Sequence, residues 1–251
     1  MTSSSGLEQQ TAPLVASVDV EWTKNYRIQG GNRPFCYSIT WLALAAHGGP
    51  VFQYVSAYVE SEAETQDLID AADRLLAELL DTPTLITGHQ LSSDLAILAN
   101  ASGQPTPGVE AMRRRWHGRR AADPAPLVDT RYDTDHLLSG TSRRLVDVAT
   151  ELGLDVTQPE LRNTSMTALH RRWLHEHDPA ARERITVLNL RHSLSTALIA
   201  AAAAGQSVPL AGLNVNRLLF DHLADIFDWV RTPVFTRLLR PPSIDGGRQR
   251  T

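Results

Sequence analysis

The chain has 251 residues, of which 42% are hydrophobic and 21% are charged, as in an ordinary globular protein with a sizeable core. Its only cysteine is Cys36, which excludes an internal disulfide and fits a cytoplasmic location. The formal net charge of -4 argues against a protein that coats nucleic acid without specificity. This net charge does not exclude an enzyme that holds the end of one nucleic-acid strand in a local basic groove.

No membrane segment is expected. The first eleven residues are polar and do not show the basic and then apolar pattern of a signal peptide. The longest apolar run, over residues 197–204, is far shorter than the roughly 20 residues of a bilayer span. We therefore expect a cytoplasmic protein without a membrane partner.

The N-terminal part is predicted to be rich in strands. A polar lead-in over residues 1–12 has the composition of a disordered segment. Three runs of apolar and β-branched residues follow, with Gly-containing joins between them, and they predict strands over residues 14–20, 35–46 and 51–59. Because strands with such joins pair with their neighbours in the chain, we expect an antiparallel meander.

From residue 62 the apolar residues recur at helical spacing. Two short runs predict further strands, a buried one at 84–87 and another at 127–130. Further helices are predicted over residues 92–100, 132–138, 143–152, 165–177 and 179–204, with Ser92 or Ser93 as the N-cap of the first. The order predicts an α/β fold: a mixed sheet of three antiparallel and then parallel strands, flanked by helices. It resembles the ribonuclease-H-like layout.

One main domain is expected over residues 13–205, followed by a helical extension over residues 206–240. The extension has apolar residues at helical spacing, so it is expected to pack on the main domain or on a second subunit. The second arrangement would make a homo-oligomer. Residues 241–251 are expected to form a flexible basic tail.

Three acidic residues are the first candidates for chemistry. Asp19 and Glu21 are two positions apart on a predicted strand, so both side chains project from one face. Asp94 opens a predicted helix directly after a short buried strand, which brings it to the same edge of the sheet. Clustered carboxylates are costly unless a cation compensates them, and they suit Mg²⁺ or Mn²⁺. Taken alone, Asp19 and Glu21 could lie where the strand emerges into solvent, and Asp94 could interact with the helix dipole. Taken together, the three acids favour a metal site.

Three segments resemble the motifs of the DEDD family of 3′–5′ exonucleases. They are VDVEW at residues 18–22, GHQLSSDLAIL at 88–98 and LVDTRYDTDHLL at 127–138, and the likeness extends over about residues 15–203. The resemblance implies hydrolysis of phosphodiester bonds with two divalent metal ions, Mg²⁺ or Mn²⁺, at the ends of single-stranded DNA or RNA. It also implies that Asp19 bridges both ions, Glu21 binds the first and Asp94 serves the second.

The last motif of that family departs from its pattern here. It supplies a fourth acid from a late helix, and the matching stretch is VLNLRHSLSTAL at residues 187–198. In the tyrosine-type register His192 takes the place of the fourth Asp, and Leu188 that of the Tyr. In the histidine-type register His192 is the residue that activates water, and Ala197 replaces the Asp. His192 is therefore a metal ligand, a general base, or the mark of a degenerate site.

Several further residues are candidates for contact with a substrate. Trp22 or Tyr26 could stack on a terminal base, and His89 beside the acidic cluster could contact a phosphate. Asn189 and Arg191, next to His192, could orient the scissile phosphate. His89 could instead be an exposed residue of a turn without a role in binding, and Arg191 could instead be a surface charge.

The segment RRRWHGRR at residues 113–120 mixes guanidinium groups with an aromatic ring. Arg115 and Trp116 in it could contact the backbone and the bases of a strand. A solvated loop explains the same composition equally well.

The resulting hypothesis is a metal-dependent 3′–5′ exonuclease in which Asp19, Glu21, Asp94 and His192 are the catalytic and metal-binding residues. One rival is a catalytically degenerate module that keeps the fold to bind nucleic acid or a protein partner. Another is a structural subunit that assembles through its C-terminal helices.

Overall fold

The protein is described here from a computed structural model, which covers residues 2–3, 15–23, 31–44, 49–82, 84–120, 127–161 and 164–240. Its centre is a six-stranded mixed sheet in the order β1-β4-β3-β2-β5-β6. The strands are β1 (Thr2–Ser3), β2 (Val15–Thr23), β3 (Arg33–Leu44), β4 (Pro50–Tyr58), β5 (Leu85–Gly88) and β6 (Leu127–Asp129).

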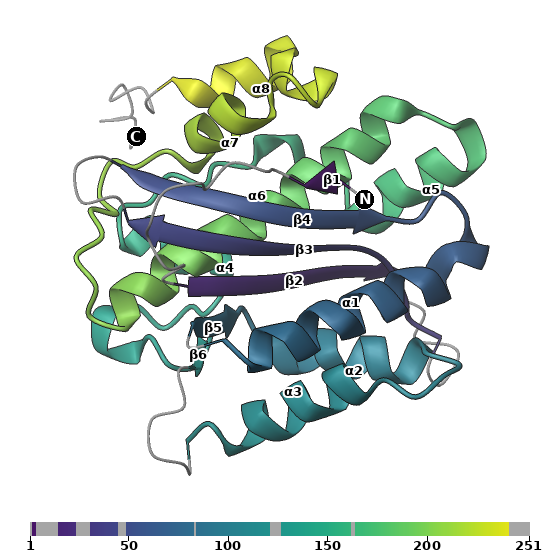
Figure 1. Cartoon of the computed structure of the whole chain (residues 1–251). Coiled ribbons are helices and arrows are strands. Elements are labelled where there is room, and N and C mark those ends of the chain that lie inside the picture. Colours follow the sequence, from purple (N-terminus) through teal and green to yellow (C-terminus); the bar gives the residue numbers. More distant parts are fainter. Residues whose placement is uncertain are drawn as a thin grey trace.

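The sheet is antiparallel on one side and parallel on the other. β2, β3 and β4 form the predicted antiparallel meander. β5 then pairs with β2, and β6 with β5, in parallel. The prediction of an α/β fold with a mixed sheet flanked by helices is therefore confirmed (Figure 1).

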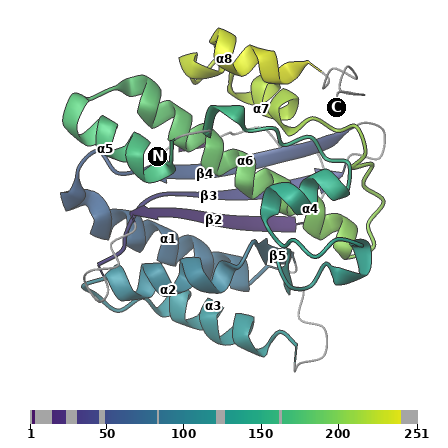
Figure 2. The same cartoon turned by 180° about the vertical axis from the view of Figure 1, so that it is seen from behind.

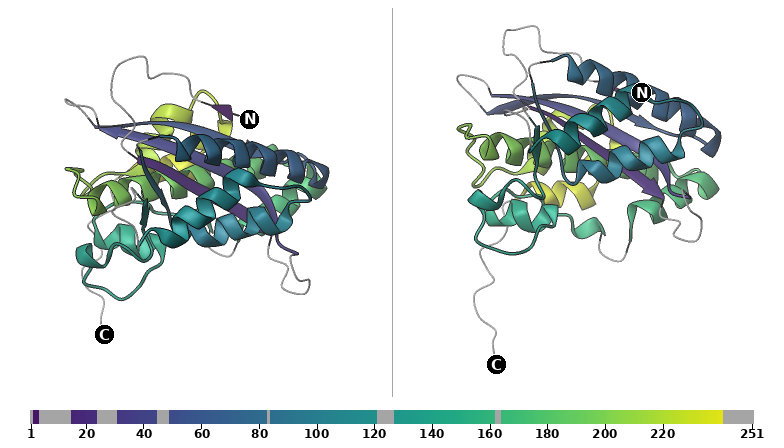
Figure 3. Two further views of the ribbon diagram at one scale, coloured as in Figure 1. Left: turned by 60° about the horizontal axis from the view of Figure 1, so that its bottom comes forward. Right: turned by 90° about the horizontal axis from the view of Figure 1, so that it is seen from below.

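Helices cover both faces of this sheet. They are α1 (Thr65–Leu80), α2 (Leu91–Ala101), α3 (Pro107–Gly118), α4 (Leu145–Glu151), α5 (Met166–Glu176), α6 (Pro179–Ala203), α7 (Val215–Leu223) and α8 (Pro233–Thr236). α1 lies in front of the strands in Figure 1, whereas α6 crosses behind them, as the reverse view shows (Figure 2). Seen from below, the strands lie between α1 on one side and α4 and α6 on the other (Figure 3).

The alternation of side chains along β2 divides the two faces. Ala16, Val18 and Val20 belong to the apolar cluster that includes α1, α2 and α3. The intervening residues face α6, and among them are Asp19 and Glu21, which contact α6 side chains. The period of two in strand side chains therefore directs the two acids toward one helix.

Small polar residues let α6 approach the sheet closely. The Ser193 hydroxyl donates to the backbone oxygen of Ser17 over 3.0 Å, and the Ser38 hydroxyl donates to the backbone oxygen of Asn189 over 3.2 Å. All four residues are fully buried. These bonds fix the register of α6 against β2 and β3, and hence the positions of side chains on the next turns.

Three expectations about local structure are wrong. A helix was expected over residues 132–138, but the structure has only a short 3-10 turn at Asp135–Leu137. Neither Ser92 nor Ser93 caps α2, since the preceding Gln90 is the N-cap residue, in a left-handed conformation with φ 66° and without a side-chain cap bond. Within the lead-in, Thr2–Ser3 pairs with β4; its other residues lie outside the described part of the chain, as does the tail at 241–251.

The C-terminal extension packs on the main domain. α7, α8 and the turn at Asp228–Arg231 contribute Val215, Leu219, Trp229 and Phe235 to one apolar cluster with α6. In Figure 1 they lie together at the top of the molecule, beside β4 and α6. No helix within the described ranges combines the length and the apolar character needed to cross a membrane.

Candidate metal centre

The two strand acids lie where β2 extends past the end of β5. β5 pairs with β2 only from Val15 to Ser17, so the edge of β2 beyond Ser17 is not covered by β5. Asp19 and Glu21 follow at this edge, with side chains that are 16% and 17% exposed. Their carboxylates are thus largely shielded but still reachable from solvent.

Asp94 reaches the same place from α2. The tight turn after β5 carries the chain into this helix, and it requires Gly88, because a Cβ there would lie 2.6 Å from Leu91 Cβ. Asp94 itself is only 5% exposed. Burial and the charges of Asp19 and Glu21 hold the pKa of Asp94 well above its usual value, although a backbone hydrogen bond from Val20 opposes them. The carboxyl group of Asp94 is therefore under electrostatic strain that a cation would relieve.

His192 completes the cluster from α6. Its Nδ1 lies 3.2 Å from Glu21 Oε1 and 3.7 Å from Asp19 Oδ2. Its Nε2 lies 3.3 Å from Oε1 of Gln158. Burial alone would lower the pKa of His192, but hydrogen bonds to the two carboxylates and their charges together raise it to about 10.

Asn189, one helical turn before His192, fixes the orientation of Asp19. Its Nδ2 donates to Asp19 Oδ2 over 2.5 Å. Its Oδ1 lies 3.6 Å from the Sγ of the buried Cys36, within the range of a weak thiol hydrogen bond. The sequence singled out Asn189 as a contact for phosphate, but its amide group is directed at Asp19 instead.

These residues surround a small cavity. Its volume is about 180 Å³, and its lining residues are Asp19, Val20, Glu21, Trp22, His89 and Asp94. Three further side chains predicted from the sequence, Trp22, His89 and Asp94, therefore line one cavity with Asp19 and Glu21. Tyr26, predicted beside Trp22, lies outside the described residues.

The arrangement suits a divalent cation. One ligand atom each of Asp19, Glu21 and His192 can be chosen so that all lie within 4.8 Å of one another. Ligands on opposite sides of a Mg²⁺ ion are about 4.2 Å apart, so a small contraction would close this set around one ion. Asp94 is not a member of this closest group and lines the adjoining cavity instead.

Two predicted substrate contacts are buried in the core. Trp116 is 1% exposed and belongs to the apolar cluster under α1 to α3. Arg191 has no exposed surface, and its guanidinium lies 5.8 Å from the ring centre of Phe235. Since neither side chain can reach a substrate from these positions, we withdraw both from the substrate-binding set.

Arg115 also has a structural partner. Its Nη1 donates over 3.0 Å to the backbone oxygen of Leu80, at the C-terminus of α1. The segment at residues 113–120 is the second half of α3 and the following turn, so it is not the solvated loop that its composition allowed. Basic residues around one aromatic residue are therefore equally typical of a helix that buries the aromatic ring and of a loop that binds single-stranded nucleic acid.

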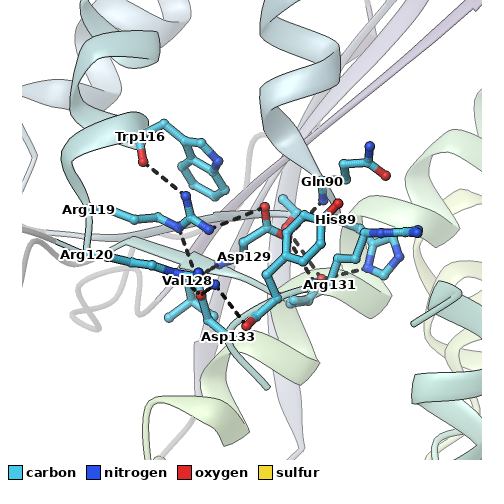
Figure 4. A network of polar contacts seen from close by, with 12 residues as sticks. His89, Gln90, Trp116, Arg119, Arg120, Val128, Asp129, Arg131 and Asp133 are labelled. Carbon is cyan, nitrogen blue, oxygen red and sulfur yellow. Dashed lines mark hydrogen bonds and ion pairs between the residues drawn. The ribbon is translucent and has the colours of Figure 1, made fainter. Parts of the chain in front are cut away.

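A buried ion network supports the turn that carries His89 (Figure 4). Asp129, at the end of β6, accepts from the backbone N–H of Gln90 over 3.0 Å. Arg119 lies 3.9 Å from Asp129 and donates over 3.0 Å to Asp133. The sequence predicted neither this network nor the contact of Gln158 with His192. Both contacts connect residues that are far apart in the chain and belong to no common motif.

No protein-family model matches this chain. No curated protein matches its sequence either.

Proposed function

We propose that this chain is a metal-dependent 3′–5′ exonuclease of the DEDD type, with a ribonuclease-H-like fold, that acts on single-stranded DNA or RNA ends. The observation that carries the proposal is the meeting of Asp19, Glu21 and His192 at ligand distance, with Asp94 in the adjoining cavity. The fold part is supported by an antiparallel trio of strands followed by parallel β5 and β6. Both features agree with the order of the three motifs along the chain.

Asp19, Glu21 and His192 would hold the first divalent ion, and Asp19 with Asp94 the second. Bound divalent ions supply Lewis-acid activation of the phosphate and of the attacking water. The residues of the chain itself position this chemistry: Asn189 orients Asp19, and the carbonyl group of Gln158 faces Nε2 of His192. With Nε2 donating to Gln158, Nδ1 is directed at the carboxylates as an acceptor for a metal.

The tyrosine-type register is the one we favour. His192 contacts the two strand acids, as a residue in place of the fourth acid would. Leu188 and Ala197 are both fully buried in apolar clusters, so neither lies at the cavity. Because an imidazole replaces a carboxylate, the centre is expected to prefer Mn²⁺ over Mg²⁺.

One observation favours the rival hypothesis of a degenerate binding module. In the absence of metal, His192 pairs with both Asp19 and Glu21, and these carboxylates hold its pKa at about 10. A protonated His192 already compensates part of the acidic charge. A metal ion must therefore displace a proton as well as bind.

The test is degradation of end-labelled single-stranded DNA and RNA with Mn²⁺ or Mg²⁺, comparing the wild type with Asp19→Asn. The substitution keeps the shape of the side chain and removes the charge, so loss of activity would reflect the centre rather than misfolding. We expect stepwise shortening from the 3′ end with the wild type only. If the folded wild type leaves both nucleic acids intact while calorimetry still detects binding to them, the module hypothesis takes its place.

A further inference from the structure

Arg131, directly after β6, is a half-buried cation without a hydrogen-bonded or ionic partner for its side chain in the part of the chain that the structure describes. Its Nε atom is buried and makes no hydrogen bond. Only its backbone N–H has a partner, Asp129 Oδ1 at 3.0 Å. A guanidinium that is partly removed from water and not paired costs free energy, which an incoming anion would recover.

The neighbouring arginines differ from Arg131 in this respect. Arg119 and Arg120 both bind Asp133, at 3.0 Å and 2.6 Å, and Arg143 binds Asp135 at 2.7 Å. The local acids are thus already committed to other guanidinium groups. No local carboxylate among the described residues is therefore left to accept a hydrogen bond from the Arg131 side chain.

Tyr132 adds an exposed aromatic ring beside this guanidinium. The Arg131 guanidinium carbon lies 5.6 Å from the centre of the Tyr132 ring. Tyr132 is 44% exposed and is one of three large hydrophobic residues with such exposure in the described ranges. An exposed tyrosine costs hydrophobic free energy, and nucleic-acid-binding surfaces use such rings to stack bases.

Arg131 lies close to His89, one of the residues that line the candidate metal centre. His89 lines the cavity with Asp19, Glu21 and Asp94, and its Nδ1 lies 3.0 Å from the hydroxyl oxygen of Thr130, the residue before Arg131. Figure 4 shows the Arg131 and His89 side chains on the same side of the ion network. Next to burial, the charge of Arg131 is the largest cause that lowers the pKa of His89, to about 4, which agrees with this proximity.

We propose that Arg131 and Tyr132 form a strand-binding platform at the edge of the metal centre, where Arg131 binds a phosphate of a single-stranded nucleic acid and Tyr132 stacks on an adjacent base. The inference rests on the proposed nuclease function and names the surface that holds the strand. The planar guanidinium fork matches two phosphate oxygens. This pair takes the role that the sequence predicted for Arg115 and Trp116. Arg115 instead donates to the backbone oxygen of Leu80, and Trp116 is buried in the core.

The test is fluorescence anisotropy with a labelled oligonucleotide of about eight nucleotides, in an Asp19→Asn background with Mn²⁺ so that the probe is not degraded. Arg131→Gln, Tyr132→Leu and Tyr132→Phe are compared at several salt concentrations. Arg74→Gln is the matched control, because Arg74 is exposed on α1, which covers the face of the sheet opposite α6, and its loss removes the same charge.

We expect Arg131→Gln to weaken binding about tenfold and to reduce the slope of log Kd against log salt concentration by about 0.7, the value of one phosphate contact on a single strand. Tyr132→Leu should weaken binding about fivefold or more with an unchanged salt slope, and Tyr132→Phe should restore it. Arg74→Gln should bind as the background protein does.

Different failures separate this inference from the proposed function. If the wild type degrades strands but Arg131→Gln and Tyr132→Leu bind like Arg74→Gln, the platform is excluded and the nuclease proposal stands. If the probe binds with the expected variant pattern but the wild type never cuts, the platform stands and the catalytic proposal falls. If the background protein does not bind the probe at all, the platform is excluded.

Discussion

Asn189 donates a hydrogen bond from its side-chain amide to Oδ2 of Asp19 over 2.5 Å, and so a residue of α6 fixes one carboxylate oxygen of the candidate centre. The same amide nitrogen lies 3.3 Å from the backbone oxygen of Asp19. The acid is therefore held in one orientation before any ligand arrives. Such preorganisation is what a metal site needs, because ligand geometry then costs little on binding.

We predict that Asn189→Leu destabilises the protein by about 1.5–3 kcal/mol, the usual contribution of a hydrogen bond to a charged group. The leucine has a similar volume but leaves Asp19 without its donor. Urea unfolding in the presence of EDTA measures the change. Ser193→Ala is the matched control on the same helix, since it removes a hydrogen bond between neutral groups and should cost about 1 kcal/mol. Equal losses in the two variants would show that the Asn189 bond has no special role.

A second prediction concerns the departure from the four-acid pattern. His192→Asp places a carboxylate beside Asp19 and Glu21, so without metal the like charges repel and the melting temperature should fall. Added Mg²⁺ should then raise the melting temperature more in this variant than in the wild type, because hard ions prefer oxygen ligands. His192→Asn, neutral and of similar size to Asp, is the control and should show a smaller response to Mg²⁺. Scanning calorimetry with EDTA, Mg²⁺ and Mn²⁺ decides the matter.

The sequence was sufficient for strands β2 to β6 and for the two acids of β2. A period of two in a buried strand places Asp19 and Glu21 on one face, and this needs no knowledge of distant residues. Asp94 was found because a helix that begins just after a short parallel strand starts at the edge of the sheet where β2 also ends. The alternation of side chains in a strand and the start of a helix after a strand were therefore sufficient to predict the site residues of β2 and α2.

Residues whose role depends on packing were not accessible in this way. Trp116 and Arg191 have the residue types that bind nucleic acids, but the helical phase that buries them is set by α1 and α8, which the local sequence does not reveal. Gln158 meets His192 only because a long connection after α4 returns to α6. The distinction between Arg131 and its paired neighbours likewise depends on which carboxylate each guanidinium reaches.

A third prediction tests the support of the turn that carries His89. Arg119 is 12% exposed and lies between Asp129 and Asp133, whereas Arg120 is 64% exposed and donates to Asp133 and to the backbone oxygen of Tyr132. Arg119→Gln removes the counter-charge of the buried Asp129 and one of the two guanidinium partners of Asp133, and should cost about 3 kcal/mol. Arg120→Gln should cost less than about 1 kcal/mol, as exposed ion pairs do. Urea unfolding of the two variants, which remove the same charge from adjacent positions, compares them directly; equal costs would contradict the network in Figure 4.

The last prediction is a loss of stability in mild acid that involves His170. This residue of α5 is 3% exposed, its ring stacks on Phe35 at 4.1 Å between centres, and its Nδ1 lies 2.6 Å from the Tyr58 hydroxyl. Burial raises the pKa of Tyr58, so the hydroxyl stays protonated and donates to a neutral imidazole. Burial also lowers the pKa of His170 from 6.5 to about 4.

Because the folded pKa of His170 lies below the unfolded one, the contribution of His170 to stability is fully present above pH 6.5. As the pH falls from 6.5 toward 4, the unfolded chain binds a proton that the folded chain does not, and up to about 3 kcal/mol is lost. Below pH 4 both states are protonated and the loss from His170 levels off. His89, with its pKa also lowered to about 4, adds to the decline in the same window.

The variant His170→Gln isolates this contribution. It should be less stable than the wild type at pH 7, because the contacts with Phe35 and Tyr58 are lost, but its unfolding free energy should fall less steeply between pH 6.5 and 4. His136→Gln is the control, since it removes an exposed histidine and leaves the buried ring in place. Urea unfolding at several pH values across this window gives the slopes. If His170→Gln kept the full wild-type slope, the acid sensitivity would have to arise from His89 and the carboxyl groups, and not from the buried imidazole of α5.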